Sequence, residues 1–270
     1  MPKRSALVVI LLSTSVAAPS QTSPSIATTD AAALSLPHRH EPVLQKPAKH
    51  SGGIHWGPLL REWWTNLVIE QTERMVQQAK TRDALSGPFF RDWFNTASTY
   101  HFDRWDDDDK FVTSNLAHPM QGAIVEAIFW QNNDQVRLSD QDFHSAAYRK
   151  ALLQAFAFAT FDAVQFKLGP LSESSIGNVG LPAHWWDQDC KQLNLSCEPR
   201  TGLNDLILNE VGGTALTIGF QWLDKHLQKR IEQGAHGRAL IDTTRILTNP
   251  PQSVANIMRK RRPWFRDNRP

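Results

Sequence analysis

Hydrophobic side chains recur every three or four residues along the chain from Pro58 onward, which is the period of an α-helix. Pro58 stands where a first helical turn would begin, and Leu59 and Trp63 start a stripe that continues to about residue 80. The stripe predicts an amphipathic helix that turns this face to the protein core. The alternative is a helix on a membrane surface, because Trp63 and Trp64 are adjacent and Trp favours that interface.

A second strong pattern lies between residues 151 and 161, which are apolar nearly all round a helix and therefore predict a helix buried in protein or lipid. Ser139 to Asp142 has the form of a capping box and predicts the start of this helix, and Gly169-Pro170 predicts its end. The stretch from 151 to 168 is near the lower length limit of a membrane span and contains Asp162. We expect partial embedding or attachment to a surface.

A long helix is predicted from Asn204 to Gln233. Small residues that permit close approach of another helix lie along it, namely Gly212, Gly213 and Gly219. A shorter helix is expected over 237–247, and one more turn is expected through Met258. Because no strand pattern accompanies these helices, the predicted fold class is all-α: a compact helical bundle with semi-apolar helices.

The first 17 residues have the pattern of a secretory signal peptide. Lys3 and Arg4 precede a short apolar run, and the small residues Ser15 and Ala17 occupy the expected positions before a cleavage site. The apolar run is shorter than the ~20 residues of a membrane span, although an uncleaved anchor is the alternative. We therefore expect an exported protein, periplasmic or associated with an envelope membrane.

The composition fits one folded domain with tails: 270 residues, 30.5 kDa and 41% hydrophobic side chains. A mean hydropathy of -0.41 excludes a chain built mainly of membrane spans. Residues 18–56 are rich in Pro, Ser, Thr, Ala and His and predict a disordered linker. A helical domain over 57–258 and a basic tail over 259–270 complete the predicted organisation.

The net charge of +2 argues against a general nucleic-acid binder, so we expect no nucleic-acid partner. Residues 259–270 hold six Lys or Arg and one Asp, which concentrates the basic charge at one end of the chain. With Trp264 and Phe265 as interfacial anchors, this tail suits an anionic membrane surface or another envelope component as partner. A solvated tail without a partner is the alternative.

The two cysteines, Cys190 and Cys197, are separated by six residues. In an oxidising compartment such a pair most simply closes a disulfide around a loop. A zinc site would need more soft ligands near this pair, and none follow at zinc spacing.

An acidic run that contains Asp106, Asp107 and Asp108 is the one candidate metal site. Adjacent carboxylates suit a hard divalent cation such as Ca²⁺, which takes oxygen ligands. However, the calcium loops of helix–loop–helix proteins space their acids at alternate positions, and this run does not. A solvated acidic loop is the alternative, and no other cofactor is expected.

His118 precedes Pro119, which suits the first position of the apolar helix that follows. The residue before a proline is disfavoured in helical conformation, so His118 is expected at the mouth of that helix. Glu126 follows about two turns along one side. His118 is a candidate general base or ligand, and the alternative is a histidine that fixes the helix entry by bonding loop backbone.

Glu173 and Ser174 follow the buried helix, and Asp205 and Glu210 open the long one. Carboxylates and hydroxyls at the end of an apolar helix suggest a polar pocket, in which burial would raise the pKa of one acid. Asp205 and Ser174 are equally suited to cap helices. The chain contains neither Gly-x-Ser-x-Gly nor His-Glu-x-x-His, so the standard serine and zinc hydrolase interpretations fail.

Four motifs follow one another: Trp-Asp-Asp-x-Asp from Trp105, His-Pro-x-Gln-Gly from His118, Gly-Pro-x-Ser-Glu-x-Ser-x-Gly from Gly169, and Asn-Asp-Leu from Asn204 with a later Gly-Gly. In this order they resemble an uncharacterised family of bacterial cell-envelope proteins, over roughly residues 94–223. The resemblance implies an exported, helix-rich, membrane-associated protein and gives no activity. This chain departs from the family pattern in having Asp where relatives carry Gly in the acidic run.

Two functional hypotheses follow. The first is a non-catalytic envelope protein, a bundle on or partly in a membrane whose polar motifs lock helix ends together. The second is a hydrolase or transferase at the membrane surface that acts on a lipid or envelope precursor. Its candidate catalytic residues are His118, Glu126, Glu173, Ser174 and Asp205. The enzyme hypothesis requires these side chains to converge around a cavity.

Overall fold

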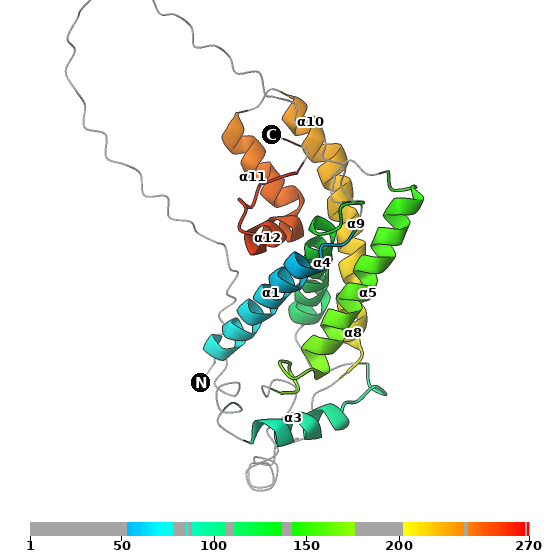
Figure 1. Cartoon of the computed structure of the whole chain (residues 1–270), viewed down its shortest axis with the longest axis vertical. Helices are drawn as coiled ribbons and strands as arrows, with labels where there is room; N and C mark the ends of the chain where they lie inside the picture. The colour runs from blue at the N-terminus through cyan, green and yellow to red at the C-terminus, as the bar shows by residue number, and fades with distance from the viewer. Residues whose placement is uncertain are drawn as a thin grey trace, which may run out of the picture. The chain divides into compact units, whose positions relative to one another are not determined.

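The computed structural model describes residues 53–77, 85, 88–105, 111–136, 142–175, 202–234, 237–267 and 269. All of them belong to a unit formed by residues 47–270. Every regular element in these ranges is a helix, which confirms the all-α bundle (Figure 1). The elements are α1 (Trp56–Gln77), α3 (Phe89–Ser98), η1 (Thr113–Ala117), α4 (His118–Gln131), α5 (Ala146–Leu168), α8 (Asn204–Ile207), η2 (Leu208–Gly212), α9 (Gly213–Leu223), η3 (Asp224–Gln228), α10 (Lys229–Gln233), α11 (Arg238–Thr248) and α12 (Pro250–Met258).

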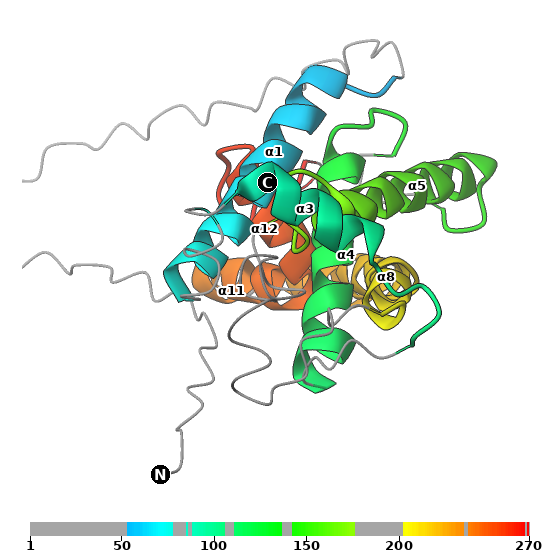
Figure 2. The same cartoon turned by 90° about the horizontal axis from the view of Figure 1, so that it is seen from below.

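The helix α4 is central to the bundle and packs against α5, α9, α12 and α1 (Figures 1 and 2). Apart from Glu126, its sequence is apolar on every side between Ala123 and Trp130, so it can be surrounded without leaving an apolar face in water. The core around it contains Val125, Ile128 and Phe129, all at most 1% exposed. The prediction of an apolar helix after His118 is confirmed.

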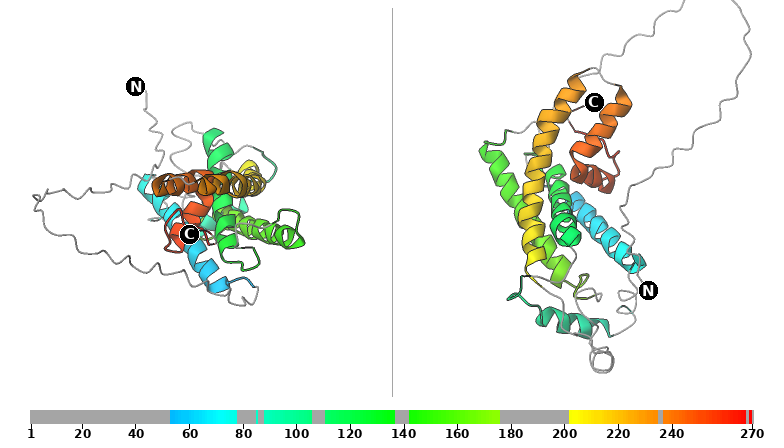
Figure 3. Two further views of the ribbon diagram at one scale, coloured as in Figure 1. Left: turned by 90° about the horizontal axis from the view of Figure 1, so that it is seen from above. Right: turned by 180° about the vertical axis from the view of Figure 1, so that it is seen from behind.

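The predicted long helix from Asn204 to Gln233 is confirmed as an unbroken run of α8, η2, α9, η3 and α10 (Figure 3, right). Within this run, η2 and η3 are π-helical turns, in which hydrogen bonds span five residues and the helix widens locally. Gly234 caps the C-terminal end, as its position in the sequence suggests. The run packs along α4, and its η2 turn also touches α5.

A close backbone contact joins α4 to this long helix. A methyl group on Gly122 would lie 2.0 Å from the carbonyl oxygen of Asn209, and one on Gly213 would lie 3.0 Å from the backbone of Gly122. Gly212 faces the ring of Pro119 in the same way, at 3.0 Å. The expected close approach is therefore made through Gly212 and Gly213. Nothing lies within 4 Å of the Cβ position of Gly219.

One face of the helix α1 packs on the core, as predicted by the interpretation of this segment as an amphipathic helix that faces the core. Leu59, Trp63 and Leu67 are buried on this face, and the indole of Trp63 meets Phe158 of α5 edge to face at 6.2 Å between ring centroids. The helix begins at Trp56, two residues before the expected Pro58. Its backbone start is fixed by the His55 N–H, which donates to the Asn132 carbonyl over 2.8 Å.

The start of α5 differs from the prediction. The helix begins at Ala146, and its N-cap is Ser145, whose hydroxyl accepts from the Tyr148 N–H at 3.1 Å. Asp142 instead forms a turn before the helix, where its carboxylate accepts from the His144 N–H at 3.0 Å. The helix therefore begins four residues after Asp142, the last residue of the predicted capping box, and its cap is the Ser145 hydroxyl. The end of α5 before Gly169 is confirmed.

Among the described helices, none combines the length and the hydropathy that crossing a bilayer requires. The helix α5 shows why, because it carries Arg149, Lys150, Asp162 and Lys167.

The described part of the basic tail folds back onto the bundle. Arg266 is buried and pairs with Asp224 at 3.0 Å, and Arg269 binds both Asp224 and Glu232. Arg259 pairs with Asp267 at 3.1 Å. The exposed cations of this segment are Lys260, Arg261 and Arg262. Half of the basic charge that the sequence places in the tail is thus used inside the protein.

The contact of Gly122 with Asn209 allows the packing of α4 on the long helix to be tested. Gly122→Ala should lower the free energy of unfolding by about 1–3 kcal/mol, because the new methyl group must displace a backbone carbonyl. Gly219→Ala is the matched control and should raise stability by about 0.5–1 kcal/mol, because an open helical glycine only costs backbone entropy. Urea denaturation of both variants checks this, and equal effects would contradict the crossing.

Candidate functional site

Four charged or polar side chains meet between α4, α5, the loop after α5 and α8. The Lys167 ammonium group lies 2.6 Å from a Glu173 carboxylate oxygen and 2.5 Å from an Asp205 carboxylate oxygen. The same Asp205 oxygen lies 2.9 Å from Nε2 of His118. All four side chains are at most 6% exposed. We call His118, Lys167, Glu173 and Asp205 the histidine–lysine cluster.

His118 reaches the cluster from within a continuous helix, not from a helix mouth. Its dihedral angles, φ −63° and ψ −47°, are helical, and its N–H bonds to the carbonyl of Thr113, five residues back. The prediction from Pro119 was wrong because the π-helical turn η1 changes the hydrogen-bond register just where the proline would interrupt it. The helix therefore passes through the proline and holds the imidazole on its inner side.

Lys167 was not foreseen as a site residue. Burial alone would lower the pKa of its ammonium group, but the carboxylates of Glu173 and Asp205 outweigh burial and hold that pKa above its ordinary value. The ammonium group is therefore charged and compensated by two acids. Its only signal in the sequence is a lysine in the last turn of an apolar helix, six residues before Glu173.

The loop from Gly169 to Ser175 completes the C-terminal end of α5. The last four carbonyls of a helix have no partner within it. Here they accept from the Gly169 N–H, the Glu173 N–H, the Ser174 N–H and hydroxyl, and the indole N–H of Trp93 on α3. The Ser174 hydroxyl donates to the Lys167 carbonyl at 2.6 Å. Ser174 thus satisfies the C-terminal end of α5, which is the capping role weighed for it in the sequence.

The motifs of the sequence resemblance meet around this cluster. The carbonyls of Arg104 and Trp105 accept from the N–H groups of Leu203 and Asn204, at 2.9 Å each. The first motif thereby satisfies the start of α8, which carries Asp205. Asp205 does not cap α8, whose N-cap is Leu203 and has no side-chain cap hydrogen bond, and the Asp205 N–H donates to the side chain of Asn204 at 2.7 Å. Its carboxylate is left for His118 and Lys167.

Glu126 does not join this cluster but belongs to a neighbouring one, Glu126, Asp162 and Glu210, which we call the carboxyl cluster. Glu126 is fully buried and accepts from the Thr214 hydroxyl, and Glu210 accepts from the Thr160 hydroxyl. Asp162 accepts from the indole N–H of Trp63 at 2.6 Å. No cation among the described residues pairs with any of the three acids at ion-pair distance.

Burial dominates the acidity of these three carboxyl groups. It raises the pKa of Glu126 and of Glu210 to about 7, although threonine hydrogen bonds oppose it. Burial likewise raises the pKa of Asp162 to about 6, against the hydrogen bond from Trp63. The charges of Glu126 and Asp162 add to the rise at Glu210. The expectation that burial raises the pKa of one acid is met, in a different cluster from His118.

The two clusters limit what chemistry this region supports. His118, Glu173 and Asp205 converge as the enzyme hypothesis requires, with Glu126 beside another set of acids. However, a substrate must reach these groups, and their side chains are almost completely buried in the described part of the bundle. Lys167 is paired with both Glu173 and Asp205, and Asp205 also lies against His118, so these groups hold three helices together.

No group of three or more metal-ligating side chains suited to a metal ion occurs within the described ranges. The predicted metal ligands Asp106, Asp107 and Asp108 lie outside these residues, so that site stays a prediction. Cys190 and Cys197 also lie outside them, and so does the predicted signal peptide.

In comparisons with known proteins, no family model, no curated protein and no solved structure matches this chain.

The histidine–lysine cluster should stabilise the fold through its lysine. Lys167→Met should cost about 3–5 kcal/mol of unfolding free energy, because it leaves two buried carboxylates without their cation. The triple variant Lys167→Met, Glu173→Gln, Asp205→Asn should recover much of that loss. His118→Ala should cost about 1–3 kcal/mol, because it removes the buried polar contact with Asp205. Unchanged thermal melting of the His118 variant would contradict a structural role for the imidazole.

The carboxyl cluster should make stability fall as pH rises. The folded protein holds protons on Glu126 and Glu210 between pH 4.5 and about 7, where the unfolded chain has lost them. Stability is therefore greatest below pH 4.5 for these groups and declines until about pH 7. Glu126→Gln keeps an acceptor for Thr214. It should remove a decline in the free energy of unfolding on the order of 2–3 kcal/mol as the pH rises.

Denaturation of the wild type and the Glu126→Gln variant at pH 5, 6, 7 and 8 measures this difference, and those pH values bracket the pKa of about 7. Glu73→Gln is the matched control, since Glu73 is exposed on α1. A pH profile of Glu126→Gln that runs parallel to the wild type would refute the proton on Glu126.

Proposed function

We propose that this chain is an exported, non-catalytic module of a bacterial cell envelope that attaches to an anionic membrane surface through apolar helix faces. The observation that carries the proposal is the distribution of side chains. Thirty polar or charged side chains and nineteen hydrophobic ones are buried among the described residues, while twenty-five large hydrophobic ones are exposed. In water-soluble proteins, large apolar patches of this kind mark interaction surfaces.

The helix α1 presents the clearest exposed face. Leu60, Trp64 and Val68 recur every four residues and are 43–48% exposed. The side of α1 that faces the protein carries Glu62 and Asn66, both at most 4% exposed. Glu62 and Asn66 lie inward beside the buried Trp63, and the outer side carries Leu60, Trp64 and Val68, an arrangement suited to apolar surroundings.

The apolar face of α1 continues onto α5 through aromatic contacts. The indole of Trp63 lies 6.2 Å from that of Trp64 and 5.5 Å from the ring of Phe161, measured between centroids. Phe161 and Val164 of α5 are about half exposed, at 54% and 46%. We call Leu60, Trp64, Val68, Phe161 and Val164 the apolar face.

The inward polar groups are bound, which lets the bundle keep them away from water and lipid. The Glu62 carboxylate accepts from the amides of Gln131 at 2.7 Å and Asn132 at 2.6 Å. Glu70 accepts from the amides of Asn66 at 2.9 Å and Gln121 at 3.2 Å. These hydrogen bonds offset the desolvation cost of burying the polar side chains on the inner side of α1.

Charge and sequence support a membrane as the partner. α12 packs against α1, and the exposed cations Lys260, Arg261 and Arg262 follow directly after α12. Basic residues beside Trp and Phe attract anionic lipid headgroups. The signal-peptide pattern of residues 1–17 and the resemblance to envelope proteins support export.

The burial of the histidine–lysine cluster favours this proposal over a membrane-surface hydrolase or transferase. An enzyme would need His118 or Asp205 at a surface that a lipid substrate can reach. Both side chains are at most 6% exposed and contribute instead to contacts among α4, α5 and α8.

Vesicle binding tests the proposal. The chain from residue 18 onward should float with vesicles of 70% phosphatidylcholine and 30% phosphatidylglycerol, mole fractions of about the range in which anionic lipid attracts basic segments. The variant Leu60→Gln, Trp64→Gln, Val68→Gln should bind roughly a hundredfold more weakly, at about 1 kcal/mol for each half-exposed side chain.

The matched control is Leu240→Gln, Leu247→Gln, which removes two exposed apolar side chains from α11. It should bind vesicles like the wild type. In cells, the tagged full chain should appear in the envelope fraction. Equal vesicle binding by both multiple variants, or recovery of the protein from the soluble periplasm, would overturn membrane attachment through α1.

A further inference from the structure

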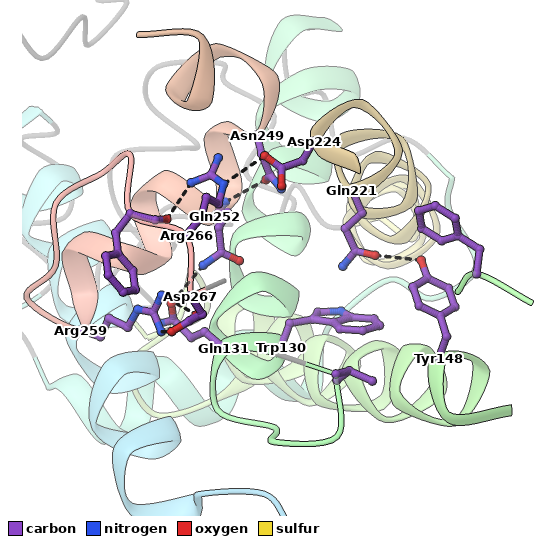
Figure 4. Close-up of a pocket in the computed structure, with 13 residues that line it drawn as sticks. Trp130, Gln131, Tyr148, Gln221, Asp224, Asn249, Gln252, Arg259, Arg266 and Asp267 are labelled. Atoms are coloured by element: carbon purple, nitrogen blue, oxygen red, sulfur yellow. Dashed lines mark hydrogen bonds and ion pairs between the residues drawn. The ribbon is translucent and has the colours of Figure 1, made fainter. Parts of the chain in front are cut away.

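We propose that a pocket between α4, α5, α9 and α12 binds a neutral saccharide. The pocket is open to solvent at its mouth, and the space inside it is about 60 Å³. This is smaller than a site that encloses a whole drug-sized ligand, so a sugar would enter with one edge and leave the rest of its ring at the open mouth. Figure 4 shows Trp130 of α4 at its base, with Tyr148 and Gln221 on one side and Gln252 on the other. It is separate from both buried clusters and does not depend on membrane attachment.

The indole N–H of Trp130 is the main observation that points to a ligand. Trp130 is 4% exposed, and its Nε1 atom has no hydrogen-bond partner among the described residues. Buried indole N–H groups normally find an acceptor. Figure 4 shows the nitrogen edge of the ring turned towards the space below Gln221. A ligand oxygen in the pocket would supply the missing acceptor.

The amide of Gln221 also contributes a donor. Its Oε1 atom accepts from the Tyr148 hydroxyl at 2.8 Å, which fixes the amide orientation and turns the NH₂ group away from Tyr148. The amide of Gln252 donates to Gln131 at 3.3 Å and to Asn256 at 3.2 Å, which leaves its own oxygen as an acceptor. Donors and acceptors side by side match hydroxyl groups, since each hydroxyl both donates and accepts.

Charges in the pocket wall are paired with one another. Asp224 binds Arg266 at 3.0 Å, and Asp267 binds Arg259 at 3.1 Å. The charges of two carboxylates and two guanidinium groups therefore cancel. This cancellation removes the electrostatic attraction of the pocket for an anionic or a cationic ligand. This pairing favours a neutral ligand.

Aromatic rings supply the apolar part of the wall. Trp130 and Tyr148 lie 5.2 Å apart between centroids at 40°, and Phe143 meets Tyr148 edge to face at 5.0 Å. Trp130 and Tyr148 are each 4% exposed, so only the edges of these rings line the pocket, and the edge of a sugar that enters it can touch them and bond the amides at once. A peptide would be expected instead on a strand edge or in a continuous apolar groove.

Saturation-transfer NMR and calorimetry of the full chain with glucose, galactose, N-acetylglucosamine and maltotriose test the proposal. At least one sugar should bind. Gln221→Ala should weaken it about tenfold, the effect of one lost hydrogen bond in a fixed geometry. Trp130→Phe keeps an aromatic ring, removes the N–H and should weaken binding similarly. Gln233→Ala, at an exposed site on α10, is the matched control and should bind like the wild type.

Thermal melting establishes that each variant is folded, and Gln221→Ala keeps the experiment decisive if the Trp130 variant is not. The proposal is overturned if no sugar in the panel binds. It is equally overturned if binding survives the loss of the Gln221 amide, or if citrate, spermidine or a neutral tripeptide binds in the pocket and the sugars do not.

Discussion

The ammonium group of Lys167 holds together parts of the chain that are distant in sequence. It comes from the end of α5, and its two carboxylate partners come from the loop after that helix and from the start of α8. His118 adds α4 through the same Asp205 oxygen. Such a buried cation is costly to desolvate, so the fold must deliver both acids to it at once. The capping of α5 by Ser174 and the π-helical turn before His118 are what bring these groups into place.

Polar groups occupy the bundle interior beyond the contacts of Lys167 as well. Besides the ionic cluster, α1 turns Glu62 inward to two amides, and α9 turns Thr214 towards Glu126. When polar groups occupy inner positions, the apolar residues of the same helices are left on the outside, as Trp64 and Phe161 are. The exposed apolar face and the buried polar contacts are therefore two aspects of one arrangement. An apolar environment around part of the bundle would suit both.

Helix positions could be predicted from the sequence because they depend on local periodicity and stop residues, as for the run from Asn204 to Gln233. His118, Glu173 and Asp205 could be chosen because polar residues beside apolar helices are conspicuous. Lys167 could not, since a lysine near a helix C-terminus is ordinary until its partners are known. Glu126 was assigned to the wrong set because the rotation of a helix about its axis depends on neighbours such as Gly122 and Asn209, which sequence spacing does not encode.

The π-helical turns have a consequence for how this chain can change over time. Each adds one residue to a helix without ending it, and one residue rotates everything downstream by about 100° around the axis. The long helix therefore consists of three short helices whose orientations are set separately by η2 and η3. Exposed positions of α9 such as Gly219 can change without touching α4, but a single deletion within η2 would turn Thr214 away from Glu126 and present a different side of α9 to α4. The contact of this segment with α4 therefore depends on its length as well as on Gly212 and Gly213.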